Sequence, residues 1–163
     1  MYLFFLDVDG TLTDGKIHVG ENGEIFKSFN VKDGYIIHNI FPKYDIVPVI
    51  ITGRESIIVK KRCEELGIEE IHQGCTNKKK KMLEIAERYG VALNEEGILI
   101  NSVYMGDDIP DLECMLTVEI SGCPADSVKE IKDVSKYVCR CKAGDGAVRE
   151  FADWLIETRI NIE

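Results

Sequence analysis

Residues 1–11 read MYLFFLDVDGT, and this stretch decides the fold class. Residues 2–8 are predicted to form a strand, because a nearly continuous apolar run is typical of a strand buried on both faces of a parallel sheet. The strand ends in two aspartates, Asp7 and Asp9, followed by Gly10 and Thr11. Since α/β sheets bind ligands at the carboxyl ends of their strands, the two aspartates are predicted to lie at a functional site.

Further along the chain, apolar runs alternate with segments of helical periodicity. Strands are predicted at residues 46–51, 102–105 and 118–121, and helices at residues 34–44, 55–66, 78–89, 110–116 and 146–158. This alternation predicts a Rossmann-like α/β fold, a parallel sheet with helices on both faces. Residues 1–163 are predicted to form one domain, since this length suits a single hydrophobic core.

Residues 16–29 (KIHVGENGEIFKSF) interrupt the alternation. Apolar residues at Ile17, Val19, Ile25 and Phe29 flank a central Glu-Asn-Gly, and Asn-Gly is a strong signal for a tight turn. The segment is therefore predicted to be a β-hairpin that projects from the first strand. A two-stranded hairpin is marginally stable alone, so we expect this one to pack against a partner.

The composition disfavours several classes of function. A net charge of −9 opposes binding to nucleic acid or to an anionic membrane surface. No apolar stretch approaches the roughly 18 residues of a membrane span, and the short run after Met1 lacks the basic leader and cleavage site of a signal peptide. The six cysteines are scattered without C-x-x-C pairs. We expect reduced thiols in the cytoplasm rather than disulfides or zinc ligands.

Asp7 and Asp9 are two residues apart, so their carboxylates would point the same way if the strand continued through Asp9. Like charges so placed repel unless a cation lies between them or one acid is protonated. A hard divalent cation such as Mg²⁺ takes oxygen ligands of this kind. An EF-hand calcium loop is the nearest alternative, but its sixth position requires glycine and here is Leu12.

Three further segments carry the polar groups that such a site needs. The second strand is followed by Thr52-Gly53-Arg54, the third by Gly106-Asp107-Asp108-x-x-Asp111, and Lys78 opens the helix at residues 78–89. A carboxylate nucleophile, a hydroxyl, a lysine and metal-binding acids together indicate phosphoryl transfer, because the metal and the lysine neutralise the phosphoryl oxygens. A slip of one residue would put Lys79 in place of Lys78.

In this order, D-x-D-G-T, a hydroxyl after the second strand, a lysine and G-D-D-x-x-D resemble the motifs of the haloacid dehalogenase superfamily of phosphatases. The resemblance covers residues 3–155. It implies that Asp7 is the nucleophile, which forms an aspartyl-phosphate. It also implies that Asp9 protonates the leaving alcohol and then activates water, and that Thr52 and Lys78 bind the transferring phosphoryl group.

The same resemblance implies a metal site. Asp107 would complete the coordination of Mg²⁺ together with Asp7 and the backbone carbonyl of Asp9. Asp108 and Asp111 would orient Lys78 and the metal-bound water.

Contacts to the rest of the substrate are expected from Gly53, Arg54, Asp33, Gly34 and Arg149. Arg54 could alternatively form an ion pair at the surface and make no contact with the substrate. Asp33 is also a candidate N-cap of the helix at residues 34–44, and Asp145 of the helix at residues 146–158. The resemblance implies that residues 144–149 reach an active site, although Ala143 replaces one of the family's glycines there.

The spacing leaves no room for a cap domain. Between Asp7 and Thr52 there is room for a hairpin and a helix, and between Lys78 and Asp107 for a helix, a loop and a strand. The sub-motifs DGTLTDG, FNVKDGY, IITGRESIIV, QGCTNK and GAVRE resemble the capless 3-deoxy-D-manno-octulosonate 8-phosphate phosphatases. A phosphorylated eight-carbon 2-keto-3-deoxy sugar acid is therefore the expected substrate.

A related branch acts on the 9-phosphates of the nonulosonates KDN and N-acetylneuraminate. That branch carries glutamate after Thr-Gly, where this chain has Arg54, which favours the eight-carbon substrate. Residues 122–126 and 139–141 are more similar to the nine-carbon branch, so its substrates remain an alternative.

The resemblance further implies a homotetramer in which the hairpin of one subunit covers its neighbour's site, and a cytoplasmic role in lipopolysaccharide biosynthesis. Two other classes stay open. A non-catalytic module could keep the fold for oligomerisation, although the intact Asp7, Asp9, Thr52, Lys78 and Asp107 argue against it. A phosphomutase would need a cap to keep its intermediate from water.

Overall fold

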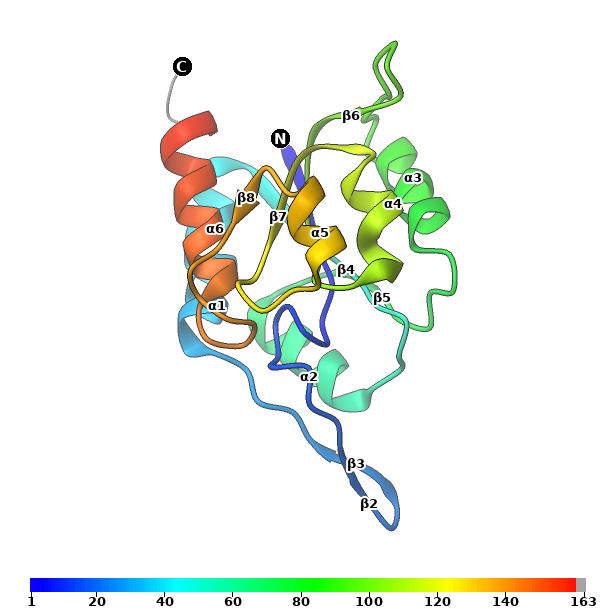
Figure 1. Cartoon of the computed structure of the whole chain (residues 1–163), viewed down its shortest axis with the longest axis vertical. Coiled ribbons are helices and arrows are strands. Elements are labelled where there is room, and N and C mark those ends of the chain that lie inside the picture. The colour runs from blue at the N-terminus through cyan, green and yellow to red at the C-terminus, as the bar shows by residue number, and fades with distance from the viewer. Residues whose placement is uncertain (161–163) are drawn as a thin grey trace.

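The computed structural model describes residues 1–160, which are built around a six-stranded parallel sheet (Figure 1). The strands are β1 (Tyr2–Leu6), β4 (Ile46–Ile51), β5 (Glu70–His72), β6 (Leu99–Met105), β7 (Val118–Cys123) and β8 (Tyr137–Val138). Their order across the sheet is β5-β4-β1-β6-β7-β8, and each neighbouring pair is parallel. The predicted Rossmann-like fold is confirmed.

Helices cover both faces of this sheet, because successive side chains of β1 point to opposite sides. Phe4 and Leu6 pack against α2 (Ile57–Leu66), α6 (Ala147–Leu155) and the helical segment that begins at α1 (Val31–Tyr35) and continues through Ile36–Ile40 and Phe41–Tyr44. Leu3 and Phe5 pack against α3 (Lys78–Arg88), α4 (Leu112–Met115) and α5 (Lys129–Val134). Each fully buried side chain of this kind contributes roughly 1.5–3 kcal/mol.

The predicted elements are present, but several begin or end elsewhere. The first strand ends at Leu6, and the strands predicted at residues 102–105 and 118–121 extend to Leu99–Met105 and Val118–Cys123. The strands β5 and β8 and the helix α5 were not predicted. The two strands hold only 3 and 2 residues, too few to produce a periodic signal.

The predicted N-caps Asp33 and Asp145 are both wrong. Asn30 caps α1, because its side chain accepts a hydrogen bond from the backbone N of Lys32 at 2.8 Å. The helix α6 begins after Gly146, whose φ of 90° is left-handed and which offers no side-chain cap. Asp33 instead serves the other helix: its Oδ1 accepts a hydrogen bond from the backbone N of Arg149, 2.8 Å away in the first turn of α6.

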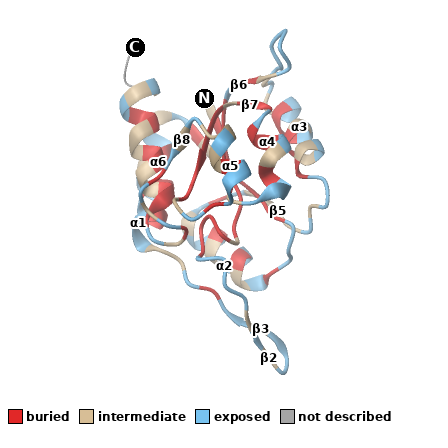
Figure 2. Cartoon of the chain, in the orientation of Figure 1, coloured by how far each residue is buried: buried red, intermediate tan, exposed pale blue. Residues whose placement is uncertain are grey.

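The hairpin forms as predicted from β2 (His18–Gly20) and β3 (Gly23–Phe26), which are antiparallel. Figure 1 shows it standing away from the rest of the fold, and Figure 2 shows its residues as largely exposed. Val19 is 67% exposed, Ile25 60% and Phe26 48%. Phe29 differs, since it packs against the hydrophobic core.

Within residues 1–160 no cap domain is present. The chain between β1 and β4 holds only the hairpin and the helical segment at Val31–Tyr35 and beyond, and the chain between α3 and β6 is a loop. None of the six cysteines, all of which lie within residues 1–160, forms a disulfide in this structure. No helix of the described residues is long and apolar enough to cross a lipid bilayer.

Candidate active site

The candidate site lies where β4, β1 and β6 end side by side. Leu6 of β1 lies opposite Ile50 on one side and Met105 on the other. Asp7 therefore follows the middle strand, with Thr52 after β4 and Asp107 after β6. The backbone N of Asp7 donates to the carbonyl of Met105 at 3.1 Å, which continues the pairing just past the strand end.

Lys78 links Asp7 to Asp111. Its Nζ lies 2.7 Å from Oδ1 of Asp7 and 2.7 Å from Oδ1 of Asp111, and all three side chains are buried. Burial lowers the pKa of Lys78, but the two carboxylates raise it by more, so the lysine remains cationic. An ammonium has three donors, so one N–H is left for a substrate oxygen. Lys79 lies instead in a surface groove with Glu113, so of these two lysines it is Lys78 that contacts the carboxylates of the candidate site.

Asp7, Asp107 and Asp111 form a carboxylate cluster, in which one oxygen of each residue lies within 4.8 Å of the others. Burial raises the pKa of Asp7 to about 6 and that of Asp107 to about 8, and repulsion between the neighbouring carboxylates adds to both shifts. Mg²⁺ stabilises a set of mutually repelling oxygen donors of this kind, of which Asp7 and Asp111 are buried and Asp107 half-buried. The residues present therefore fit a divalent cation.

Gly10 brings the backbone of the D-x-D-G-T turn against this cluster. Its φ is +93°, and a Cβ at this position would lie 2.1 Å from Oδ2 of Asp107. Any larger residue would both strain the backbone and displace the carboxylate. Thr11 Oγ1 donates a hydrogen bond to Oδ1 of Asp107 at 3.2 Å. The turn after Asp9 thus lies close enough to Asp107 for a backbone carbonyl to contribute to the same cation site.

Asp111 is held in place by four donors, one of which is the backbone N of Asp108 at 3.4 Å. It accepts hydrogen bonds from the Tyr104 hydroxyl at 2.7 Å, from Lys78, and from the backbone N of Asp107 at 3.1 Å. Asp108 is exposed, and its carboxylate accepts from the backbone N of Ile109 to cap the short 3₁₀ helix Ile109–Asp111. Sequence reasoning does not find Tyr104, because within an apolar strand it resembles a core residue.

Asp9 has different partners from Asp7. Because β1 ends at Leu6, the strand does not continue to Asp9, and the condition under which the two carboxylates would point the same way is not met. The Asp9 carboxylate forms an ion pair with Nζ of Lys27 and lies 3.8 Å from Nε of Arg54. Lys27, at the base of the hairpin, was not predicted, since its local sequence does not distinguish it from a surface lysine.

Thr52, Gly53 and Arg54 form the loop after β4. The backbone N of Thr52 donates to the carbonyl of His72, and the carbonyl of Thr52 accepts from the N of Cys75, each at 3.0 Å. These bonds hold the buried Thr52 at the strand end. Gly53 and Arg54 are exposed, and Arg54 borders Asp9, so a substrate entering from solvent can reach both.

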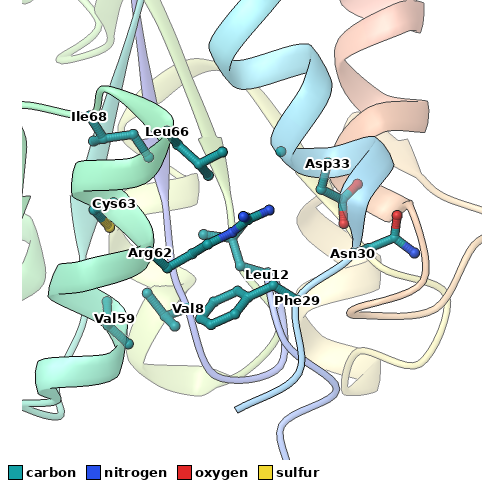
Figure 3. Close-up of a pocket in the computed structure, with 11 residues that line it drawn as sticks. Val8, Leu12, Phe29, Asn30, Asp33, Val59, Arg62, Cys63, Leu66 and Ile68 are labelled. Atoms are coloured by element: carbon teal, nitrogen blue, oxygen red, sulfur yellow. The ribbon is translucent and has the colours of Figure 1, made fainter. Parts of the chain in front are cut away.

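Asp33 lies in a second buried site, beside an apolar pocket lined by Val8, Leu12 and Phe29 (Figure 3). Its side chain is 1% exposed, and burial raises its pKa to about 6, although the backbone N–H groups of Arg149 and Gly146 partly offset this. Asp33 makes no contact with the carboxylate cluster among the interactions found in residues 1–160.

Gly34 and Arg149 belong to the same region as Asp33. A Cβ on Gly34 would lie 2.4 Å from Nη2 of Arg62, so a larger residue at this position would displace the end of the arginine side chain. The Arg149 guanidinium is 2.6 Å from Asp153 and lies 5.8 Å from the centre of the Tyr35 ring. Asp33, Gly34 and Arg149 therefore lie together. None of the interactions found in residues 1–160 connects them to Asp7 or Asp107.

The loop before α6 rests on the D-x-D-G-T turn of its own chain. The backbone N of Gly144 donates to the carbonyl of Thr11 at 3.4 Å, and a Cβ on Gly144 would lie 2.6 Å from the N of Asp14. Ala143 is buried next to it, and its N donates to Asp126 at 2.9 Å. This glycine is required by close approach, whereas the neighbouring position accommodates alanine.

A parallel α/β sheet with this carboxylate cluster, a buried lysine and no cap domain defines a metal-dependent phosphatase of the haloacid dehalogenase type. No protein-family model matches the chain. The chain is 41% identical over 154 residues to the 3-deoxy-D-manno-octulosonate 8-phosphate phosphatase KdsC of Escherichia coli strain K12. The matched region covers 94% of this chain and 78% of that protein.

Two solved structures of phosphatases with this activity in their names are similar to this chain in both sequence and fold. The 3-deoxy-D-manno-octulosonate 8-phosphate phosphatase of Moraxella catarrhalis, in complex with magnesium, phosphate and KDO, is 32% identical with a TM-score of 0.88, covering 96% of this chain and 86% of that one. The cobalt-bound deoxy-D-mannose-octulosonate 8-phosphate phosphatase of Haemophilus influenzae is 32% identical with a TM-score of 0.87, covering 96% and 88%. The chain belongs to the 3-deoxy-D-manno-octulosonate 8-phosphate phosphatase family.

Proposed function

We propose that this protein uses Mg²⁺ to hydrolyse a phosphorylated 2-keto-3-deoxy sugar acid, namely 3-deoxy-D-manno-octulosonate 8-phosphate. The observation that carries the proposal is the buried Lys78 bridging Asp7 and Asp111 beside Asp107. A cationic lysine next to metal-binding carboxylates neutralises phosphoryl oxygens as they approach a carboxylate nucleophile. The relatives named for this reaction match nearly the whole chain.

In the proposed mechanism an Oδ of Asp7 attacks phosphorus, and the bond from phosphorus to the sugar oxygen breaks as Asp9 gives that oxygen a proton. Water then attacks the aspartyl-phosphate, Asp9 takes a proton from the water, and the bond from phosphorus to Asp7 breaks to release phosphate. Mg²⁺, held by Asp7, Asp107 and the backbone carbonyl of Asp9, supplies Lewis-acid stabilisation of the phosphoryl oxygens. Lys78 and the Thr52 hydroxyl orient the transferring group.

For the rest of the substrate, we propose that Gly53 and Arg54 contact the sugar acid. Arg54 is exposed beside Asp9, and a guanidinium suits a substrate carboxylate. The burial of Asp33 and Gly34 favours a structural role for them over direct contact. Arg149 is half exposed on α6, and we retain it as a proposed substrate contact.

A substrate panel tests the proposed reaction. Phosphate release is measured from 3-deoxy-D-manno-octulosonate 8-phosphate, from the 9-phosphates of KDN and N-acetylneuraminate, and from simple sugar phosphates, with Mg²⁺ and with a chelator. We expect the highest kcat/KM for the eight-carbon acid. A preference for a nine-carbon acid would support the alternative substrate. Absence of hydrolysis across the panel by folded protein would support the non-catalytic oligomerisation module.

We further propose that residues 1–163 act as one domain in a cytoplasmic homotetramer, with the hairpin packed between subunits. The exposed Val19, Ile25 and Phe26 support this, because an apolar hairpin surface in water favours association. Shortening the hairpin across residues 20–23 should weaken both assembly, measured by light scattering, and discrimination across the substrate panel. An intact protein that stays monomeric at micromolar concentration yet selects one sugar phosphate would contradict the proposal.

A further inference from the structure

A buried lysine at the base of the hairpin contacts the proposed acid/base. The Lys27 side chain is 1% exposed, although Phe26 and Ser28 on either side are exposed. Its Nζ forms an ion pair with Oδ1 of Asp9 and lies 2.8 Å from Oε1 of Glu24. Burying an unpaired ammonium costs several kcal/mol, so the two carboxylates hold the lysine in place, and the lysine in turn holds Asp9.

Glu24 connects this ion pair to the body of the fold. Its Oε2 accepts a hydrogen bond from Oγ of Ser56, the N-cap of α2, and the backbone N of Ser56 donates to Oε1 of Gln73 at 2.7 Å. Lys27 is therefore fixed to the start of α2 rather than to the exposed end of the hairpin. A group fixed in this way can keep a neighbouring carboxyl in one orientation.

We propose that Lys27 is a positioning residue that holds the Asp9 carboxyl in the orientation for protonating the departing oxygen, and that Glu24 fixes Lys27. The inference rests on the acid/base role proposed for Asp9. Arg54 also approaches Asp9, at 3.8 Å, but its side chain is 53% exposed and its attraction is screened by water. The positive charge that contacts the carboxylate cluster belongs to a different lysine, Lys78.

This role has a chemical signature. A sugar alkoxide is a poor leaving group and departs only if it is protonated, whereas 4-nitrophenolate departs without a proton. A misplaced Asp9 should therefore slow cleavage in proportion to the basicity of the leaving oxygen. A residue that merely supports the fold would slow all substrates alike.

The experiment measures release of the leaving group in the first turnover, with saturating Mg²⁺. The substrates are a series of aryl phosphates with leaving groups of increasing pKa, and the eight-carbon sugar acid phosphate. Lys27→Met should slow the most basic leaving groups by about 10- to 100-fold and 4-nitrophenol by less than about 3-fold. Glu24→Gln should act in the same direction with a smaller effect, and Lys27→Arg should restore part of the rate.

Lys60→Met is the matched control, because Lys60 forms an exposed ion pair with Glu64 on α2 at 4.0 Å. It should leave the leaving-group dependence unchanged. Equal slowing across the series in a folded Lys27→Met protein, or no slowing, would overturn the inference.

Circular dichroism establishes whether Lys27→Met folds. If it does not, Glu24→Gln and Lys27→Arg decide, and a wild-type leaving-group dependence in both overturns the inference. Failure of the wild-type protein on the sugar acid phosphate would contradict the proposed substrate instead, and the aryl series would still report on Lys27.

Discussion

Asp7 and Asp33 are both buried aspartates whose pKa burial raises to about 6, yet their surroundings differ. Asp7 shares its site with two more carboxylates and with the ammonium of Lys78. Oδ1 of Asp33 binds the backbone of α6, and its Oδ2 has no hydrogen-bond partner within residues 1–160. Asp7 hydrogen-bonds to a charged side chain inside a cluster of carboxylates, whereas the hydrogen bond of Asp33 comes from the backbone of α6 and its nearest charges, those of Asp145 and Arg149, have opposite signs.

The difference shows what a perturbed aspartate signifies. Burial alone raises the pKa of a carboxyl group, so the shift does not identify a catalytic residue. Convergence of several charged side chains is the better indicator of a functional site, because the fold keeps mutually repelling groups together only where a ligand or cation can stabilise them. We therefore expect changes at Asp7 to act on turnover and changes at Asp33 to act on stability.

The largest contrast is expected from matched amide substitutions. Asp7→Asn should lower kcat by at least about 10⁴-fold, since an amide is a poor nucleophile and a weak metal ligand. Asp33→Asn should keep kcat within a few-fold of wild type, because the amide oxygen still accepts from Arg149. Phosphate release and circular dichroism measure both. A folded Asp7→Asn protein that retains Mg²⁺-dependent turnover would eliminate the mechanism.

Asp107→Ala should lower turnover by at least about 100-fold and weaken Mg²⁺ binding, because the cation loses a carboxylate ligand. A chelator should abolish the activity of the wild-type protein. Titration of activity with Mg²⁺ gives both quantities. Full activity in chelator, or in the Asp107→Ala variant, is incompatible with the proposed metal site.

The affinity for Mg²⁺ should rise with pH. Without metal, the pKa of Asp7 is about 6 and that of Asp107 about 8, so both bind protons that the cation must displace at lower pH. The apparent Kd should fall by at least about 10-fold between about pH 5.5 and about pH 8. Calorimetric titration, or the rise in Tm on adding Mg²⁺, measures this. Asp33→Asn should show the same dependence, and a flat profile would contradict the role of the cluster.

The smallest effect concerns stability at Asp33. Its pKa rises from 3.8 to about 6 on folding, so the folded protein binds this proton more tightly than the unfolded chain does. Its stabilising contribution is complete below about pH 4 and is lost as the pH rises through about 6. Asp33→Asn cannot ionise, so above that range its free energy of unfolding should exceed the wild-type value by up to about 3 kcal/mol.

Urea unfolding of both proteins at about pH 4.5 and about pH 7 isolates this contribution, since Asp7 and Asp107 affect both proteins equally. If the difference in the free energy of unfolding between wild type and Asp33→Asn does not change with pH, the proposed contribution of Asp33 is contradicted.

Local patterns were sufficient to predict the type of sheet, four of its six strands, the absence of a cap within residues 1–160 and the meeting of Asp7 with Asp107. The apolar run before Asp7 identifies a buried strand, and each of the other strands that border the site also ends in polar residues. Parallel strands bring their carboxyl ends to one edge, so Asp7 and Asp107 meet as a consequence of the topology. Lys78 follows from the same logic, since it opens the helix that enters this edge.

The sequence by itself therefore determined the class of fold and the position of Asp7 at the end of the first strand, because strand periodicity and motif order are properties of short segments. Only the tertiary structure decided that Asp9 pairs with Lys27 and that Asp33 binds the start of α6, 116 residues away. These partners depend on how the hairpin and the last helix pack onto the sheet. Lys27 and Asp33 carry no local signal of burial, since a charged residue is buried only where a distant segment supplies its partner.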